Sequence, residues 1–315
     1  MTKQESLTFD FGGGLFLIDL PQPSPGFRRF ISSWFFQDAA GRRVVTDPGP
    51  AGTIPLLLRE LENLTENVDL VLLTHIHLDH AGGLAEFCAR YPGVQVLAHP
   101  RAFRHLLEPR KLWDASVRTL GDIALMYGEP APLPSTVPLL EQDPAGVIEV
   151  FPTPGHAPHH ISLRVPSGGR TLFFVGEAAG MTLPLEGEGD SADHTRRPET
   201  GADLWLRPTT PPRFDADAAR HSLQLLASVL RGDELLCYAH WGASENPRER
   251  VEQAREQLEQ WFRLIAPMRD RSPEEIVDCL LTQDPLLRKS GALPRDLLER
   301  ERRFMANSVR GMLES

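Results

Sequence analysis

Cysteine is scarce in this chain of 315 residues, and the cysteines it has lie far apart. Cys88, Cys237 and Cys279 are an odd number without close spacing, which argues against a disulfide framework. No apolar run approaches the roughly 20 residues that a membrane-spanning helix needs, and the first residues do not resemble a secretory signal. We therefore expect a cytoplasmic protein that neither spans nor binds a membrane.

Lysine is equally scarce. Three lysines stand among 33 basic residues, against 43 acidic residues, and the formal net charge is −10. An acidic chain without a basic block does not suit nucleic acid or an anionic membrane as a partner. The chain also lacks a phosphate-binding loop, a dinucleotide fingerprint and a G-x-S-x-G nucleophile motif. These absences leave a small-molecule substrate as the expected partner.

The order of the segments that are present is typical of an α/β protein. Apolar residues make up 41% of the chain and charged residues 24%, as in ordinary globular proteins. Helical periodicity at 53–64 and 84–91 alternates with short apolar runs that predict strands. These strands are expected at 7–20, 30–36, 43–46, 69–74, 94–98, 146–151, 161–165 and 171–175. Residues 101–127 between them are expected to be helical.

The last third of the chain is mostly helical in pattern. Asp215 is the expected N-cap of a helix that ends near residue 230, and a last strand is expected at 234–239. After residue 245 the periodicity predicts only helices, at 247–265, 273–282 and 295–313. We therefore divide the chain into residues 1–245 and a helical extension, residues 246–315, packed on them. These helices either cap a substrate pocket or form the interface of a homodimer, and their pattern does not decide between the two.

Residues 181–212 are polar and rich in glycine and proline. The segment is long for a connection without structure, and loops of this length usually carry function. We expect it to form a mobile edge of the active site. Arg207 is the cation of interest in it, and it is either a solvated arginine of the loop or a residue that meets an acidic group of the substrate.

Potential metal ligands gather in one short stretch. Residues 74–80 read Thr-His-Ile-His-Leu-Asp-His, directly after an apolar strand and directly before a predicted helix. His75 and His77 are two residues apart at a strand end, so both side chains can point to the same place. Asp79 and His80 are expected to point to a neighbouring place. Imidazoles together with a carboxylate are ligands for Zn²⁺, iron or manganese.

Together with other segments of the chain, this stretch resembles the sequence pattern of a known family. The run HIHLDHAGG at 75–83 resembles the signature of the metallo-β-lactamase-fold hydrolases. The segments that resemble the other parts of the family pattern are VVTDPGP at 44–50, TPGHAPHH at 153–160, LFFVGEAAG at 172–180 and LLCYAHWG at 235–242. The GHAPHH form and the helix RERRFMANSVRGML point to an uncharacterised branch similar to glyoxalase II and the lactonases. The resemblance implies an αββα sandwich of two mixed sheets flanked by helices, in which residues 1–245 are the catalytic domain.

The resemblance also implies a site for two divalent metal ions, zinc first, with iron and manganese as alternatives. One ion takes His75, His77 and His156, and the other takes Asp79, His80 and His240. Glu177 corresponds to the carboxylate that bridges the two ions. The family usually has an aspartate there, so this longer side chain either bridges or has left the metal site.

The roles of the residues next to these ligands are predicted from fewer observations. We expect His160, Asp47 and Thr74 to orient the ligands through hydrogen bonds. His159 is expected to be a polar residue at the start of a strand, with a role in orienting ligands as the alternative. Trp241 either lines the substrate pocket or belongs to the core.

The leading functional hypothesis is a metal-dependent hydrolase. A metal-bound hydroxide would attack an ester, thioester, lactone or related acyl bond, and Asp79 would hold the second metal and steer the hydroxide. A mononuclear iron enzyme similar to the persulfide dioxygenases of the same fold is the second hypothesis. A metal-binding scaffold without catalysis is the third.

Overall fold

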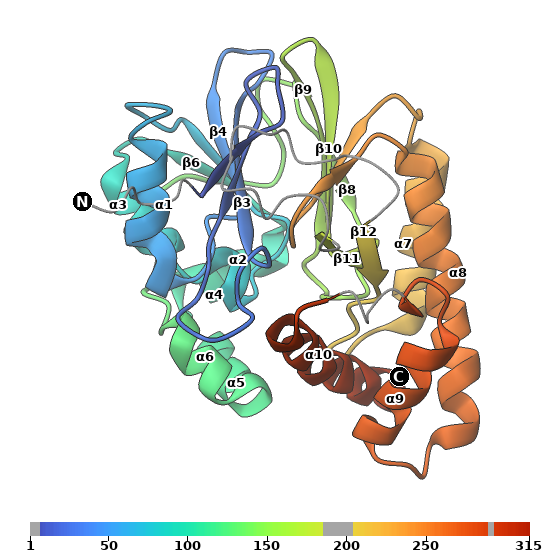
Figure 1. Cartoon of the computed structure of the whole chain (residues 1–315). Helices are drawn as coiled ribbons and strands as arrows, with labels where there is room; N and C mark the ends of the chain where they lie inside the picture. Colours follow the sequence, from blue (N-terminus) through green and yellow to red (C-terminus); the bar gives the residue numbers. More distant parts are fainter. Residues whose placement is uncertain (1–6, 185–203, 289–292) are drawn as a thin grey trace.

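The computed structural model of the protein describes residues 7–184, 204–288 and 293–315. Two mixed sheets lie side by side, and helices cover the outer face of each (Figure 1). Helices α1 (Ile54–Leu61) and α3 (Leu84–Arg90) lie outside the first sheet, and α7 (Ala216–Val229) and α8 (Pro247–Ile265) lie outside the second. The predicted αββα sandwich is therefore confirmed.

The first sheet has seven strands in the order β1-β2-β3-β4-β5-β6-β7. Their bounds are Thr8–Asp10, Phe16–Asp19, Ser32–Gln37, Arg43–Thr46, Leu70–Leu72, Gln95–Leu97 and Leu139–Leu140. Neighbours from β1 to β4 pair antiparallel, and those from β4 to β7 pair parallel. Because parallel strands end at the same edge of a sheet, β4 and β5 deliver their following loops to one place.

The second sheet has five strands in the order β14-β13-β10-β9-β8. In chain order they are β8 (Glu149–Pro152), β9 (Ile161–Ser167), β10 (Arg170–Gly176), β13 (Leu235–Tyr238) and β14 (Ala243–Ser244). Only β10 and β13 pair parallel. The segments that follow β10 and β13 therefore leave this sheet at the same edge.

One expectation about local structure is confirmed and another needs correction. Residues 101–127 form three helices, α4 (Pro100–Leu107), α5 (Arg110–Leu120) and α6 (Asp122–Tyr127), separated at Pro109 and at Gly121, whose φ is 57°. Residues 181–212 are not a loop throughout, because β11 (Met181–Pro184) and β12 (Leu204–Arg207) pair antiparallel. The middle of that segment, residues 185–203, lies outside the described residues.

The helices of the last third agree with the prediction. Asp215 caps α7 by accepting the backbone N–H of Ala218 at 2.9 Å. After α8 the chain forms the 3₁₀ turn η2 (Ala266–Met268), α9 (Pro273–Gln283) and α10 (Arg295–Glu314). Within the described ranges, no helix combines the length and the apolar character needed to cross a bilayer.

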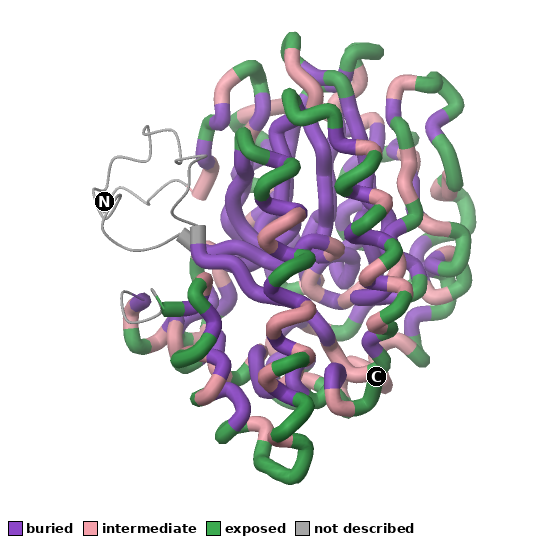
Figure 2. The backbone as a smooth tube through the Cα atoms, turned by 90° about the vertical axis from the view of Figure 1, so that its right-hand side faces the viewer, coloured by how far each residue is buried: buried purple, intermediate pink, exposed green. Residues whose placement is uncertain are grey.

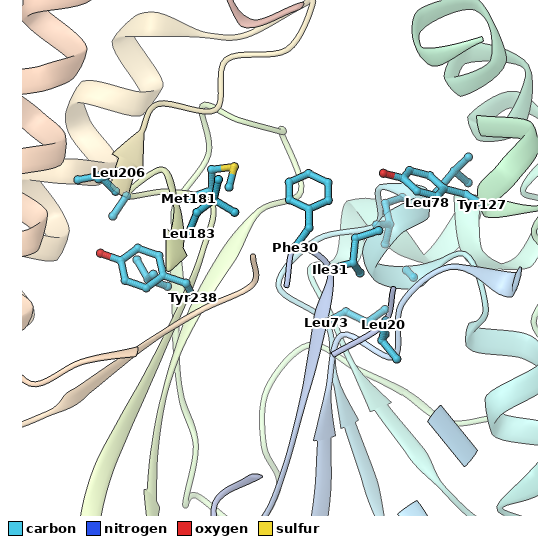
Figure 3. Close-up of a cluster of buried hydrophobic side chains, with 14 of the residues drawn as sticks. Leu20, Phe30, Ile31, Leu73, Leu78, Tyr127, Met181, Leu183, Leu206 and Tyr238 are labelled. Atoms are coloured by element: carbon cyan, nitrogen blue, oxygen red, sulfur yellow. The ribbon is translucent and has the colours of Figure 1, made fainter. Parts of the chain in front are cut away.

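The apolar core runs from the sheets into the C-terminal helices. Met305 and Val309 of α10 belong to the same buried cluster as Leu20 and Phe30 of the first sheet's side. Figure 3 shows the Phe30 ring between two groups of this cluster. One group contains Leu78 and Tyr127, and the other contains Met181, Leu183, Leu206 and Tyr238. Seen from the side of α7 and α8, the buried strands lie behind helices whose outer faces are exposed (Figure 2).

Helix α10 lies very close to the segment that follows β12. A Cβ atom at Gly311 would lie 2.1 Å from the carbonyl oxygen of Thr210 and 2.3 Å from that of Pro211. These distances are too short for any side chain. Glycine at this position therefore allows α10 to pack directly on the backbone at 210–211.

We predict that Gly311→Ala lowers the free energy of unfolding by about 1–3 kcal/mol, because the new methyl group must push α10 away. The helix propensity of alanine works in the opposite direction by about 1 kcal/mol and is the smaller effect. Urea denaturation measures the difference. Arg303→Ala, at an exposed position of the same helix, should stay within about 0.5 kcal/mol of wild type. Equal stabilities of all three proteins would contradict the close contact.

Candidate metal centre

The loops after β4 and β5 form one half of the site. Asp47 follows β4 with a φ of 49°, and its carboxylate accepts two hydrogen bonds from Thr74, from the N–H at 2.8 Å and from the hydroxyl at 2.6 Å. Because the Thr74 hydroxyl gives its only proton to Asp47, it accepts from His75 Nδ1 at 3.1 Å. His75 Nε2 is left with a free lone pair.

The end of β10 positions Glu177 in the other half. Gly176 has a φ of 58°, and a Cβ there would lie 2.3 Å from His160 Nε2. This nitrogen accepts the backbone N–H of Glu177 at 3.0 Å, and His160 Nδ1 donates to the Thr153 hydroxyl at 2.9 Å. Burial, followed by the positive potential of nearby His156, holds the pKa of His160 well below its usual value, so the ring is neutral. His160 therefore anchors the backbone that carries Glu177.

Backbone carbonyl groups orient two more imidazoles. His156 Nδ1 donates to the carbonyl of Thr209 at 3.0 Å, and His240 Nδ1 donates to the carbonyl of Phe30 at 3.2 Å. Both rings then turn Nε2 toward the site, where that of His156 lies 2.9 Å from His77 Nδ1. Sequence analysis did not find Thr209 or Phe30, because a carbonyl partner leaves no residue-type signal.

The predicted ligands come together in two groups. In each group the candidate ligand atoms lie within 4.8 Å of one another. One group is His75, His77, His156 and Glu177, and the other is Asp79, His80 and His240. These groups match the two ligand sets implied by the resemblance. Glu177, the candidate bridging residue, falls in the first group.

Glu177 lies between these two groups. Its Oε2 atom is 3.1 Å from His75 Nε2 and 2.9 Å from His156 Nε2. Its Oε1 atom is 3.4 Å from His240 Nε2 in the second group. Burial raises the pKa of Glu177. The positive potential of His156 and His240, together with their hydrogen bonds, has the larger and opposite effect, so the pKa lies well below its usual value. The alternative that this side chain has left the site does not agree with its position.

The donor atoms fit the borderline divalent ions. His75 Nε2 and both ring nitrogens of His80 are buried without a hydrogen-bond partner among the described residues. Burial lowers the pKa of His80, yet the carboxylates of Asp79, Asp47 and Glu177 outweigh it and raise the pKa well above its usual value. Free imidazole nitrogens in a strongly negative potential are what Zn²⁺, iron or manganese would occupy.

A cavity of about 770 Å³ opens over the site. His77, Asp79 and Glu177 line it together with helix α5 and helix α10, which lie on opposite sides of this end of the molecule (Figure 1). Phe304 of α10 and Leu112 of α5 are among its apolar wall residues. The C-terminal extension therefore takes part in the cavity.

The prediction that Arg207 is a cation of a mobile loop is wrong. Arg207 lies in β12 with 2% of its surface exposed, and its Nε donates to Glu301 Oε2 at 2.6 Å. Arg300 donates to the other oxygen of Glu301 at 2.8 Å. Because its charge is compensated by a buried carboxylate, Arg207 is not a free cation, although it does line the cavity. Its contact with a substrate stays a prediction.

Trp241 belongs to the core, the second of its two predicted positions. The residue is 4% exposed, and its ring packs between the sheets against Phe9, with ring centroids 4.9 Å apart. Its backbone has a φ of 59°, which is strained for a bulky residue, and its N–H donates to the Ser32 hydroxyl at 3.1 Å. This turn places His240 at the site and sends the next side chain away from it.

His159 lines the cavity, and its imidazole makes no hydrogen bond with any described residue. The residue is 9% exposed, and its Nδ1 is buried without a partner among them. Burial, followed by the positive potential of His77, lowers the pKa of His159 to about 2, so the ring is neutral. An unsatisfied buried polar group of this kind costs about 1–3 kcal/mol.

Comparisons with known proteins show the family to which the chain belongs. The family model of the metallo-beta-lactamase superfamily matches residues 26–240. The chain therefore belongs to the metallo-beta-lactamase superfamily. A hydroxyacylglutathione hydrolase of Xanthomonas oryzae is 37% identical over 210 residues, which are 66% of this chain and 59% of that protein. One from Serratia proteamaculans is 38% identical over 63 residues, 20% of this chain and 24% of that protein. The chain thus spans less than two thirds of the length of these curated relatives.

Solved structures share the fold over nearly the whole chain. An archaeal metallo-beta-lactamase superfamily protein from Sulfolobus tokodaii aligns with a TM-score of 0.61 at 22% identity, covering 95% of this chain and 98% of that one. A beta-lactamase domain protein from Burkholderia ambifaria aligns with a TM-score of 0.61 at 17% identity, covering 99% and 89%. Because their coverage includes most of the C-terminal helices, the relation in fold is not limited to the sandwich.

We predict that wild type and Glu177→Asp each retain close to two metal ions per chain after dialysis, and that Glu177→Gln retains close to one. The amide removes the negative charge that offsets two dications, so the weaker ion is lost first. Elemental analysis of dialysed protein at one pH measures this, and His221→Ala, at an exposed position of α7, serves as control. The same number of metal ions per chain in wild type, Glu177→Asp and Glu177→Gln would contradict a bridging role.

We predict that Glu301→Gln lowers the free energy of unfolding by about 3 kcal/mol, because Arg207 and Arg300 would keep buried charges without a partner. Glu299, which is exposed on the same helix and pairs with Arg295 at 2.8 Å, provides the matched control. Glu299→Gln should change the stability by less than about 1 kcal/mol. Urea denaturation of both variants checks this, and equal losses would show that the buried ion pairs do not stabilise the fold.

Proposed function

We propose that the protein hydrolyses a small acyl compound, an ester, thioester or lactone, with two divalent ions. The observation that carries this proposal is the position of the Glu177 carboxylate between two groups of potential metal ligands. A carboxylate shared in this way is suited to a pair of ions rather than to a single one. Zinc is the first ion to test, and iron and manganese follow.

The ions would supply an activated water molecule and polarise the acyl oxygen of the substrate. The chain's own residues keep the ligands in place. Asp47 and Thr74 fix the ring of His75, and the carbonyl group of Thr209 fixes that of His156. Asp79 is the most exposed carboxylate at the base of the cavity, with 15% of its side chain accessible, so it is placed to orient the attacking water.

The cavity supports a small substrate. Its volume of about 770 Å³ lies within the range of roughly 300–1,000 Å³ that is usual for small-molecule sites. Apolar side chains such as Leu112, Leu120 and Phe304 line it beside the polar base, which suits an acyl group with an apolar portion. The relatives named hydroxyacylglutathione hydrolases favour thioesters as the first class to test.

The oxygenase alternative predicts a different ligand set. A mononuclear iron enzyme of this fold needs two histidines and one carboxylate, whereas this site offers seven candidate ligands in two groups. Oxygen uptake by protein loaded with iron would favour that alternative. A metal-loaded protein that turns over no acyl substrate and takes up no oxygen would favour the scaffold.

We predict that Asp79→Asn lowers kcat for acyl hydrolysis by about 10²–10³-fold, which corresponds to several kcal/mol of transition-state stabilisation. An amide is a poor metal ligand and cannot orient the water in the same way. The measurement is hydrolysis of a panel of thioesters, esters and lactones by protein reconstituted with each ion, beside His221→Ala. Unchanged turnover in Asp79→Asn would refute the two-metal hydrolase.

A further inference from the structure

His159 is placed differently from the other histidines around the site. It lies between β8 and β9, three residues after His156, and neither of the two ligand groups includes it. Its ring centroid is 5.8 Å from that of His77 and 6.4 Å from that of His75. The rings of His159 and His75 are nearly parallel, at an angle of 12°. It therefore stands beside the first ligand group, on the wall of the cavity.

The ring nitrogens of His159 are unused within the described part of the chain. Nδ1 is buried and has no hydrogen-bond partner there. The neighbouring His160 differs completely, because both of its nitrogens are hydrogen-bonded, to Thr153 and to the backbone of Glu177. Because Nδ1 is buried, Nε2 is the nitrogen of His159 that can face the cavity, and no hydrogen bond to a described residue occupies it. His159 is therefore an imidazole on the cavity wall that is available to a molecule in the cavity.

We propose that His159 is a catalytic residue that donates a hydrogen bond to the oxygen of the scissile acyl group. The proposal rests on the acyl-hydrolase function. In that reaction the water oxygen bonds to the acyl carbon while the carbonyl electron pair moves onto the acyl oxygen. When the pair returns, the bond to the leaving group breaks, and the leaving group takes the proton that the water gives up.

His159 forms and breaks no covalent bond in this sequence. Its N–H meets the oxygen that gains negative charge, and this stabilises the transition state more than the ground state. The imidazole is suited to this in the tautomer that carries its proton on Nε2, because no described protein group accepts that proton. Removing the donor should therefore affect kcat more than KM.

The test compares His159→Phe, which keeps a ring of similar shape without a donor, with His159→Gln, which keeps an N–H donor. We expect His159→Phe to lower kcat by about 10²-fold with little change in KM, as for loss of one oxyanion donor. His159→Gln should recover part of that loss, and His221→Phe should behave as wild type. A His159→Phe variant with wild-type kcat, or one that has lost a metal ion, would overturn the proposal.

A second measurement does not depend on activity. In metal-free protein, His159→Phe should raise the urea midpoint, because it replaces an unsatisfied buried imidazole with an apolar ring. His160→Phe should lower the midpoint, because it breaks two hydrogen bonds. If both variants lower it equally, His159 has a structural partner and the proposal fails.

A third measurement separates this proposal from the proposed function. If the wild-type protein hydrolyses nothing in the panel, the hydrolase assignment fails on its own. Calorimetric titration with butanoate, the carboxylate product of a butanoyl substrate, then tests His159 directly on metal-loaded protein. Weaker binding by His159→Phe than by wild type and His221→Phe supports a ligand-binding role, and equal affinities overturn it.

Discussion

The hydrogen bonds of Thr74 join the parts of the molecule that form the site. Its side chain and N–H hold Asp47 at the end of β4, and its hydroxyl sets the ring of His75. Its carbonyl accepts the N–H of Ile161 at 2.8 Å, where β9 of the second sheet begins. One residue thus connects two strand ends of the first sheet to the second sheet, and the distances between the ligand groups depend on this junction.

The walls of the cavity have a different origin from its base. The base comes from strand ends, whereas α5 and α10 supply the two sides. Thr210 connects these layers, because its hydroxyl donates to the carbonyl of Ser308 in α10 at 2.9 Å, and the preceding residue holds the ring of His156. The base is therefore fixed by the sheets, and the shape of the opening depends on helices outside them.

The sequence allowed the fold and most of the site to be predicted, and the reasons differ between residues. The run from His75 to His80 was recognisable because its members are neighbours along the chain. His156, Glu177 and His240 needed the family resemblance, since spacing along the chain does not reveal a distance in space. Their meeting in two groups could only be seen in the structure.

The failures have physical causes as well. The strands β11 and β12 were hidden in a segment whose glycine and proline content is typical of loops. Glu301 carries a charge on the apolar face of α10. One of its arginine partners, Arg300, is the preceding residue, and the other, Arg207, lies in β12. Such a pairing has no local pattern in the sequence.

Each ligand group draws from both sheets, and this has a consequence for the life of the protein in a cell. His75 and Asp79 belong to the first sheet's side, whereas His156 and His240 follow strands of the second. An ion bound to either group would join the two halves of the sandwich, so its binding energy adds to the stability of the fold. Cells short of the metal would then hold less of the folded protein, and protein turnover would report metal supply.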